Sequence, residues 1–570
     1  MPARRVSRHL PRTLAAGLVG VLALGLTSAQ DATVADAAAA PAAVQDVAQQ
    51  PASPRGLRLV GTDTVTAYAY EGFVNLDAQV YLAAYGEGYE FWAKRARYSD
   101  PATLTKTVVR GKKRTTTKAP AAIVDGVNGF KDGLHVKITT SKGKVLADET
   151  TTLCPGGWAR QRVEPTGRTE PVYPAWCGGN WFTTSSVFGI EQGWATQLGA
   201  YFGVETTEKN LLLTTTVSEP VARFLGLPRS SRSITQKVEV VDECEIWDCE
   251  EYEEYLEGEP VEGFSTSAAG GDAEPVQAMQ AGAPQALGSH SGHGDSTQAA
   301  PSGRQTNLFT LRGEHGSRGG DHPSSGGRGA TPSSRKPAKD TLPDLVSLPA
   351  WYIMTEVDDS GTDRLAFAAN EWNAGPGPMV VEGYRRPSGE VMDAYQFFYK
   401  NGEQVGSTKT GTMAYHDAPE HDHWHFQDFA KYELVTPDGK LVTTSGKQSW
   451  CLAPTDPVDL SVKGAVWRPE ATGLDSTCGD RSALWLREVM PAGWGDTYGQ
   501  SQTLAFDLTG VRNGTYQIKV TVNPNGALHE TTRANNVSLR TVVLGGKPGA
   551  RTVTVPPYQG VDTEPWDDME

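Results

Sequence analysis

Three histidines at strict two-residue spacing are the residues of this chain with the clearest chemical potential. His421, His423 and His425 stand in the run His-Asp-His-Trp-His, and only 11 histidines occur in 570 residues. Alternate side chains of a β-strand share a face, so the three imidazoles would point to one side. Neutral imidazole suits Cu(II), Zn(II) and Fe(II), and three nitrogens leave a coordination position open. The spacing predicts a reactive metal site; the alternative is a polar strand face turned to solvent.

The sequence around these histidines predicts antiparallel β-strands that could hold them. Apolar residues alternate with less apolar ones in three runs: Leu365 and Phe367; Tyr395, Phe397 and Tyr399; and Tyr516, Ile518, Val520 and Val522. The turn sequence Thr-Pro-Asp-Gly at 436–439 separates two short apolar runs, which indicates a hairpin. Its return strand leads to residues 446–451, so we expect Lys447 to come back toward the histidines.

Several segments in order resemble the catalytic domain of the lysyl oxidase family. After the histidine run come Phe-Ala-Lys-Tyr-Glu-Leu at 429–434, Gly-Lys-Gln-Ser-Trp-Cys-Leu at 446–452 and Gly-Asp-Thr-Tyr-Gly at 495–499. The series continues with residues 514–524 and ends with Ala-Asn-Asn-Val at 534–537. The resemblance is confined to the region that we assign to a lysyl oxidase-like domain, residues 341–545.

The resemblance implies a metal, a cofactor and a reaction. In that family a His-x-His-x-His strand binds copper, and a lysine and a tyrosine cross-link into lysine tyrosylquinone. The corresponding Cu(II) ligands here are His421, His423 and His425, and the cofactor precursors are Lys447 and Tyr498. The implied activity is oxidative deamination of primary amines, either small amines or the lysines of a protein, by dioxygen. Its products are an aldehyde, ammonia and hydrogen peroxide.

Two aspartates are candidates for the general base that such a reaction needs. Asp428 follows His425 by three residues and would lie on the opposite face of a regular strand, unless a bulge intervenes. Asp496 stands two residues before Tyr498 in the cofactor motif. Both aspartates remain candidates for the base.

Two other classes of function fit the same sequence. The chain departs from the animal enzymes because residues 341–545 contain only two cysteines and because the first 340 residues lie outside the resemblance. A secreted surface-binding or adhesion protein made of two β-sandwiches, with a structural metal, is one alternative. A hydrolase with a histidine-bound zinc and a water nucleophile is the other. A quinone cofactor would separate the oxidase from both.

The net charge limits the class of partner, and the length limits the number of domains. The chain has 52 lysines and arginines against 67 aspartates and glutamates, a formal charge of −15. This balance disfavours nucleic acid and favours cationic partners such as amines. A length of 570 residues suggests about two to four domains.

The N-terminus has the composition of an export signal. Four arginines within residues 4–12 precede an apolar run at 14–26, and Thr-Ser-Ala at 27–29 provides small residues for cleavage. The apolar run is shorter than the roughly 20 residues of a membrane-spanning helix. We therefore expect a secreted protein without a stable membrane span. The arginine pair at 4–5 leaves the twin-arginine route open beside general secretion.

Cysteines of an exported chain are expected to form disulfides. The six cysteines fall into three neighbouring pairs, so we expect the pairs Cys154–Cys177, Cys244–Cys249 and Cys451–Cys478.

The composition divides the chain into segments and predicts a mainly β fold with two β-sandwich-like domains joined by a disordered Gly/Ser-rich linker. The predicted segments are a signal peptide at 1–29, an Ala/Pro-rich lead at 30–54, a β-rich domain at 55–260, the linker at 261–340, the lysyl oxidase-like domain at 341–545 and a tail at 546–570.

Overall fold

The protein is described by a computed structural model, which confirms a mainly β fold. The residues described are 55–245 and 337–564, without 71, 158, 200, 388, 417–422 and 500–503. The predicted signal peptide, the lead, nearly all of the linker and His421 therefore lie outside the described residues. Within the described residues, no helix has the length and apolar character needed to cross a membrane.

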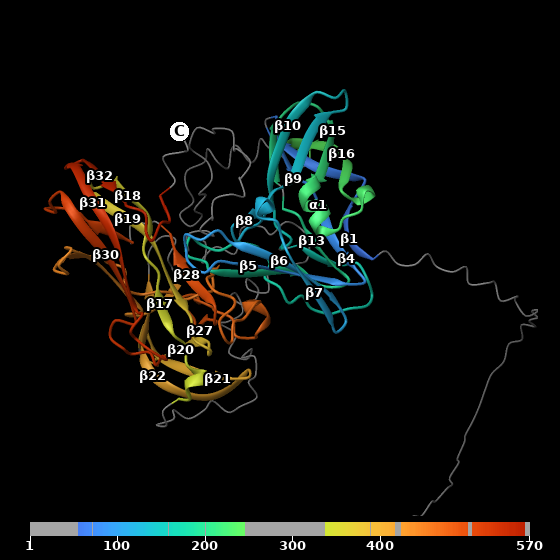
Figure 1. Cartoon of the computed structure of the whole chain (residues 1–570). Coiled ribbons are helices and arrows are strands. Elements are labelled where there is room, and N and C mark those ends of the chain that lie inside the picture. Colours follow the sequence, from blue (N-terminus) through green and yellow to red (C-terminus); the bar gives the residue numbers. More distant parts are fainter. Residues whose placement is uncertain are drawn as a thin grey trace, which may run out of the picture. The chain divides into compact units, whose positions relative to one another are not determined.

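The N-terminal β-rich part, drawn in blue to green in Figure 1, contains three sheets. The first has the order β1 (Gly56–Gly61), β4 (Val80–Tyr85), β13 (Trp194–Gln197) and β11 (Arg160–Arg162). The second has the order β10 (Val145–Leu153), β9 (Gly129–Thr140), β15 (Asn210–Val217), β16 (Ser233–Asp242), β2 (Thr64–Tyr70), β3 (Phe73–Asp77) and β14 (Tyr201–Glu205), with β8 (Val124–Asp125) paired to β9. The third has the order β12 (Ser185–Ile190), β5 (Gly88–Lys94), β6 (Thr103–Arg110) and β7 (Lys113–Lys118).

One hydrophobic core draws on all three of these sheets, with Leu82, Leu213 and Phe91 as fully or nearly fully buried members. The short helix α1 (Glu219–Leu225) packs its apolar side into the same core and can be seen against these strands in Figure 1. A proline in its first turn and Gly226 after its last, at φ 84°, explain where it begins and ends, because proline suits a helix start and glycine a left-handed cap.

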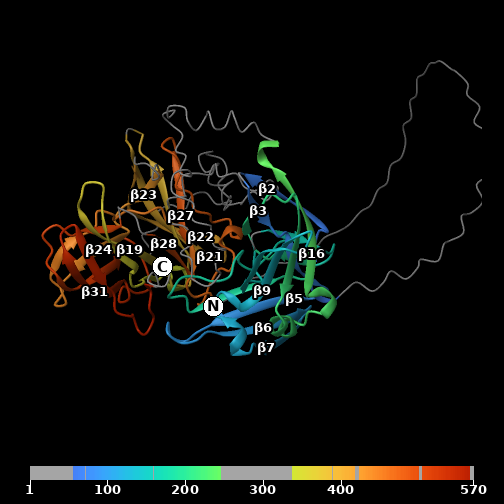
Figure 2. The same ribbon diagram turned by 90° about the horizontal axis from the view of Figure 1, so that it is seen from above.

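The C-terminal β-rich part also contains three sheets, and β23, β22, β21 and β27 can be followed in Figure 2. One sheet has the order β17 (Leu345–Ser347), β19 (Asp363–Asn373), β28 (Trp494–Tyr498) and β26 (Asp456–Pro457), with β18 (Trp351–Val357) and β29 (Ala505–Asp507) also paired to β19. The next has the order β23 (His423–Phe426), β22 (Glu403–His416), β21 (Val391–Lys400), β20 (Met379–Arg385) and β27 (Trp485–Met490). The last has the order β25 (Leu441–Thr444), β24 (Ala430–Val435), β30 (Gly514–Val522), β31 (Val537–Lys547) and β32 (Ala550–Thr554).

The expected strands form, but not all are half-buried. In β30 the side chains at Tyr516, Ile518 and Val520 are buried and their neighbours are not, as the alternation predicts. In β19 nearly every residue from Leu365 onward is buried, so the half-buried prediction is wrong there. The reason is its central place, since β19 pairs with β17, β18, β28 and β29 and places side chains in two hydrophobic clusters.

The predicted hairpin is confirmed. Strands β24 and β25 pair antiparallel around the turn that contains Gly439, whose φ of 84° needs the freedom of glycine. At the other end of this sheet the β structure continues beyond residue 545, because β31 runs to Lys547 and pairs with β32. The segment expected as a tail at 546–570 therefore begins as a hairpin. The second strand of this hairpin, β32, is partly exposed and contains threonine and arginine. It therefore lacks the apolar alternation by which strands are recognised in a sequence.

Candidate active site

The histidine strand β23 places two of the three predicted ligands together. His423 and His425 are 4% and 2% exposed, and their Nε2 atoms lie 2.9 Å apart. Trp424 points to the other face, where its indole N–H donates to the Asp480 carbonyl. This is the alternation that the sequence predicted for these three residues. His421 precedes the described part of the strand.

The Nε2 atoms of His423 and His425 fit one metal ion. Neutral imidazole nitrogens this close could both bind one ion, and imidazole is a donor that Cu(II) accepts. Among the described residues no group of three His, Cys, Asp or Glu side chains is placed to hold a metal. The predicted third ligand, His421, lies outside the described residues.

Sequence reasoning missed another histidine beside this pair. His416, at the end of β22, pairs with His423 across the two strands, and its ring stacks on His425 with centroids 5.3 Å apart. Its exposed position in a long polar strand gives it no spacing motif of its own. One feature of the sequence could have identified it: His416 stands five residues before the histidine run. A strand that ends there can pair with the histidine strand through a short connection.

Strand β23 is held on both edges, which fixes the direction of its imidazoles. One edge pairs with β22. On the other edge, Trp424 N–H donates to the Cys478 carbonyl, and Phe426 and Trp450 exchange backbone hydrogen bonds. A disulfide joins Cys478 to Cys451, the residue after Trp450, with Cα atoms 5.7 Å apart. The covalent bond therefore ties together the two segments that border the histidine strand.

Two of the three expected disulfides are confirmed. Cys154–Cys177 and Cys451–Cys478 both form. The third expected pair includes Cys249, which lies outside the described residues.

The segment after the β24–β25 hairpin brings Lys447 to Tyr498. Lys447 is 8% exposed, and its Nζ lies 4.4 Å from the centroid of the Tyr498 ring and 5.7 Å from that of Trp450. Two residues further on, Ser449 Oγ is 3.5 Å from His425 Nδ1. The segment that carries Lys447 therefore contacts the histidine strand through Ser449.

Burial sets the charge of this lysine. Loss of hydration lowers the pKa of Lys447 to about 8, although the nearby Asp496 carboxylate acts in the opposite direction. A substantial fraction of the amine is then unprotonated near neutral pH, which is the form that can attack an electrophile.

Tyr498 is fixed at the end of β28 by the backbone of one residue. Its hydroxyl accepts the Cys451 N–H at 3.2 Å and donates to the Cys451 carbonyl at 3.1 Å. Its ring contacts Trp450 edge to face. Burial raises the pKa of the Tyr498 phenol well above its usual value, and the carboxyls of Asp496 and Glu488 raise it further. The phenol is therefore neutral, and two hydrogen bonds to Cys451 position it beside the Lys447 amine.

The two aspartates proposed as general bases lie in different surroundings. Asp496 is fully buried in β28, accepts the Ala453 N–H at 3.2 Å, and is close enough to affect the pKa of Lys447. Asp428 is exposed in the turn after β23, at φ 58°, and accepts a hydrogen bond from Asn525. The strand ends at Phe426, so Asp428 lies in a turn rather than in the regular strand considered for it.

Two buried glutamates complete the surroundings of Tyr498 and were not found from sequence. Glu371 in β19 pairs in register with Asp496, and Glu488 lies in β27. Both are fully buried. Both strands also contain other polar residues, so the sequence carries no local signal that singles these glutamates out.

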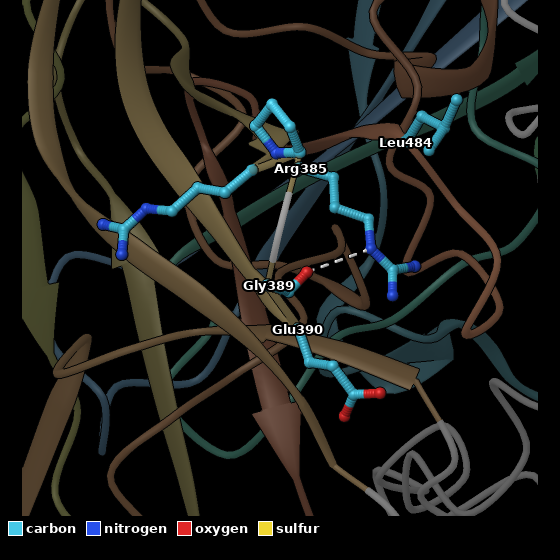
Figure 3. Close-up of a pocket in the computed structure, with 6 residues that line it drawn as sticks. Arg385, Gly389, Glu390 and Leu484 are labelled. Carbon is cyan, nitrogen blue, oxygen red and sulfur yellow. Dashed lines mark hydrogen bonds between the residues drawn. The ribbon is translucent and has the colours of Figure 1, made fainter.

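The open pocket of Figure 3 lies elsewhere, at the turn between β20 and β21. It has a volume of about 370 Å³ and is lined by Arg385, Glu390 and Leu484 among others. Arg385 Nε donates to the Gly389 carbonyl across it at 3.3 Å. None of the predicted site residues that the structure describes lines this pocket.

Comparison with known proteins adds no identification. No protein-family model matches the chain, and no curated protein matches it.

Proposed function

We propose that this chain is a secreted, copper-dependent amine oxidase whose quinone cofactor forms from Lys447 and Tyr498. The observation that carries the proposal is the 4.4 Å separation between Lys447 Nζ and the Tyr498 ring centroid. The two residues are 51 positions apart in sequence, and both are buried. Loss of hydration lowers the pKa of Lys447 more than the nearby Asp496 carboxylate raises it. Burying a lysine amine against a phenol ring costs folding free energy. Groups buried at such a cost cluster at functional sites.

The proposed metal is held by His421, His423 and His425. Bound copper would supply the redox chemistry with dioxygen that oxidises the phenol ring. The distance between the two described Nε2 atoms supports this ligand set, and Ser449 links His425 to the segment that carries Lys447.

The covalent step balances with dioxygen as oxidant. A bond forms between Lys447 Nζ and a ring carbon of Tyr498, the ring gains one oxygen, and the pair loses four hydrogens. Two molecules of dioxygen are consumed, and one hydrogen peroxide and one water are released. Lys447 suits the step because a pKa of about 8 leaves about a tenth of the amine unprotonated at pH 7, against fewer than about one in 10³ for an ordinary lysine.

The proposed substrate is a primary amine, either a small amine or a lysine of another protein. The overall reaction converts the amine, dioxygen and water into an aldehyde, ammonia and hydrogen peroxide. The formal charge of −15 favours cationic substrates, and this attraction should weaken as salt is added. The two disulfides are compatible with an extracellular site of action.

The test is peroxide release by the full chain after aerobic loading with copper, across a panel of primary amines. We expect peroxide from the unsubstituted protein and none from Lys447→Arg or Tyr498→Phe. Matched controls are Lys431→Arg, which changes a lysine that pairs with Glu433, and Tyr516→Phe, which changes a tyrosine bonded to the backbone of a turn. Peroxide from Lys447→Arg at the unsubstituted rate would refute the proposal.

A further inference from the structure

Three carboxyl side chains are buried around the Lys447–Tyr498 pair. Asp496, Glu371 and Glu488 come from three neighbouring strands and are all fully buried. Glu371 and Asp496 are direct cross-strand partners, so their side chains share one face of the sheet. Both Asp496 and Glu488 raise the pKa of Tyr498, which places them within electrostatic reach of its ring.

The cluster also fixes the backbone that follows Lys447. Glu488 Oε2 accepts the Leu452 N–H at 3.0 Å, and Asp496 Oδ2 accepts the Ala453 N–H at 3.2 Å. The Tyr498 hydroxyl bonds the residue before these two. Three consecutive backbone positions are therefore held by three side chains of the site.

The charges facing this cluster do not allow three carboxylates. Lys447, from the segment after β25, is the cation that the described neighbours supply, and Asp496 is the carboxyl that raises its pKa. The phenols of Tyr432, on β24, and Tyr498 also face the cluster and are neutral. One amine can balance one carboxylate, and a second or third buried negative charge would lack a partner.

The hydrogen bonds of the two glutamates lead to the same conclusion. Glu371 Oε1 accepts from the Tyr432 hydroxyl at 3.1 Å, while its Oε2 is buried and has no hydrogen-bond partner among the described residues. Glu488 is arranged alike, with Leu452 N–H on Oε2 and no such partner on the buried Oε1. An ionised carboxylate would leave a charged oxygen buried without a donor, whereas a neutral acid carries its proton there. Burial accordingly raises the pKa of both glutamates well above the usual range.

We propose that Glu371 and Glu488 are neutral carboxylic acids in the folded protein and act as the proton-exchanging groups of the Lys447–Tyr498 site, with Asp496 as the charge partner of Lys447. Glu371 has a fixed donor in Tyr432 and Glu488 has a fixed donor in Leu452, and these donors would stabilise the anion after a proton leaves. Each also has a bare oxygen that holds the proton before it leaves. Their protonation is independent of the proposed function, whereas their role in turnover rests on it.

Infrared spectroscopy of the metal-free protein tests protonation directly, because the C=O stretch of a protonated carboxyl is separate from carboxylate bands. At pH 7.5 we expect this band to lose intensity in both Glu371→Gln and Glu488→Gln. Glu433→Gln is the matched control, since Glu433 is largely buried but pairs with Lys431 and Lys519, which lower its pKa. An unchanged band in both glutamine variants would overturn the inference.

Turnover tests the proton-exchanging role. Glutamine keeps the size, neutrality and hydrogen-bonding capacity of the acid but cannot release a proton. We expect kcat for peroxide release to fall roughly 10²-fold in each glutamine variant, with copper content and the cross-link retained, and to recover in part in Glu371→Asp. Glutamine variants with unchanged kcat would show that the acids are only structural. If Glu371→Gln fails to fold, Glu488→Gln decides.

The two proposals fail in different ways. A protein that releases no peroxide before any substitution refutes the proposed function but leaves the infrared result standing. A protein that releases peroxide while both glutamates are ionised refutes the inference alone.

Discussion

Replacing Lys447 by methionine should remove a pH dependence of stability that follows from its burial. The side chain is only 8% exposed, and its pKa falls from 10.5 in the unfolded chain to about 8 in the folded protein. Between these two values the unfolded chain binds more protons than the folded one, so the free energy of unfolding rises with pH. For these pKa values the contribution of Lys447 rises by about 2 kcal/mol between pH 7 and pH 9.5.

The assay is denaturant unfolding of the metal-free full chain at both pH values, for the unsubstituted protein and Lys447→Met. Other groups titrate in the same window, and the difference between the two proteins removes their contribution. Between pH 7 and pH 9.5 we expect the free energy of unfolding of the unsubstituted protein to rise by about 2 kcal/mol more than that of Lys447→Met. If the free energies of unfolding of the two proteins change equally between the two pH values, Lys447 is solvated in the folded protein. That result would refute its placement against Tyr498.

Three further outcomes follow from the site. His423→Ala should lose stoichiometric copper after aerobic reconstitution. His135→Ala should keep it, because His135 forms an exposed ion pair with Asp148. Equal copper content in the two variants would contradict the ligand assignment. Replacing the Cys451–Cys478 disulfide by two serines should lower the free energy of unfolding by about 3 to 4 kcal/mol from loop entropy, measured by denaturation. Asp428→Asn should leave the rate of peroxide release within about twofold, since Asp428 is an exposed turn residue; a large loss would restore it as a base candidate.

The fold of the histidine region could be predicted because its signals are local. Period-two spacing fixes which face His423 and His425 share, and the Pro-Asp-Gly turn fixes the hairpin that returns the chain to Lys447. The meeting of Lys447 with Tyr498 was expected from the family resemblance and from the position of the hairpin. The distance between the Lys447 amine and the Tyr498 ring depends on tertiary packing, which no local sequence pattern encodes.

The remaining parts of the site depend on contacts between distant strands. Glu371 belongs to it because β19 pairs with β28, although Glu371 is far from the cofactor motif in sequence. Glu488 is ten residues before Tyr498, but no local pattern shows that its side chain lies within electrostatic reach of the Tyr498 ring. His416 belongs to it through the register of β22 on β23. The half-buried prediction for β19 failed for the same reason, since the number of strands that pair with a given strand is a property of the whole fold.

The cross-link between Lys447 and Tyr498 is the most direct test of the central claim. Aerobic copper loading followed by proteolysis and mass spectrometry should yield one peptide in which these residues are joined, with one oxygen gained and four hydrogens lost. A metal-free sample should contain both residues unmodified. If copper-saturated, folded and aerobically incubated protein also contains both residues unmodified, the oxidase proposal is contradicted.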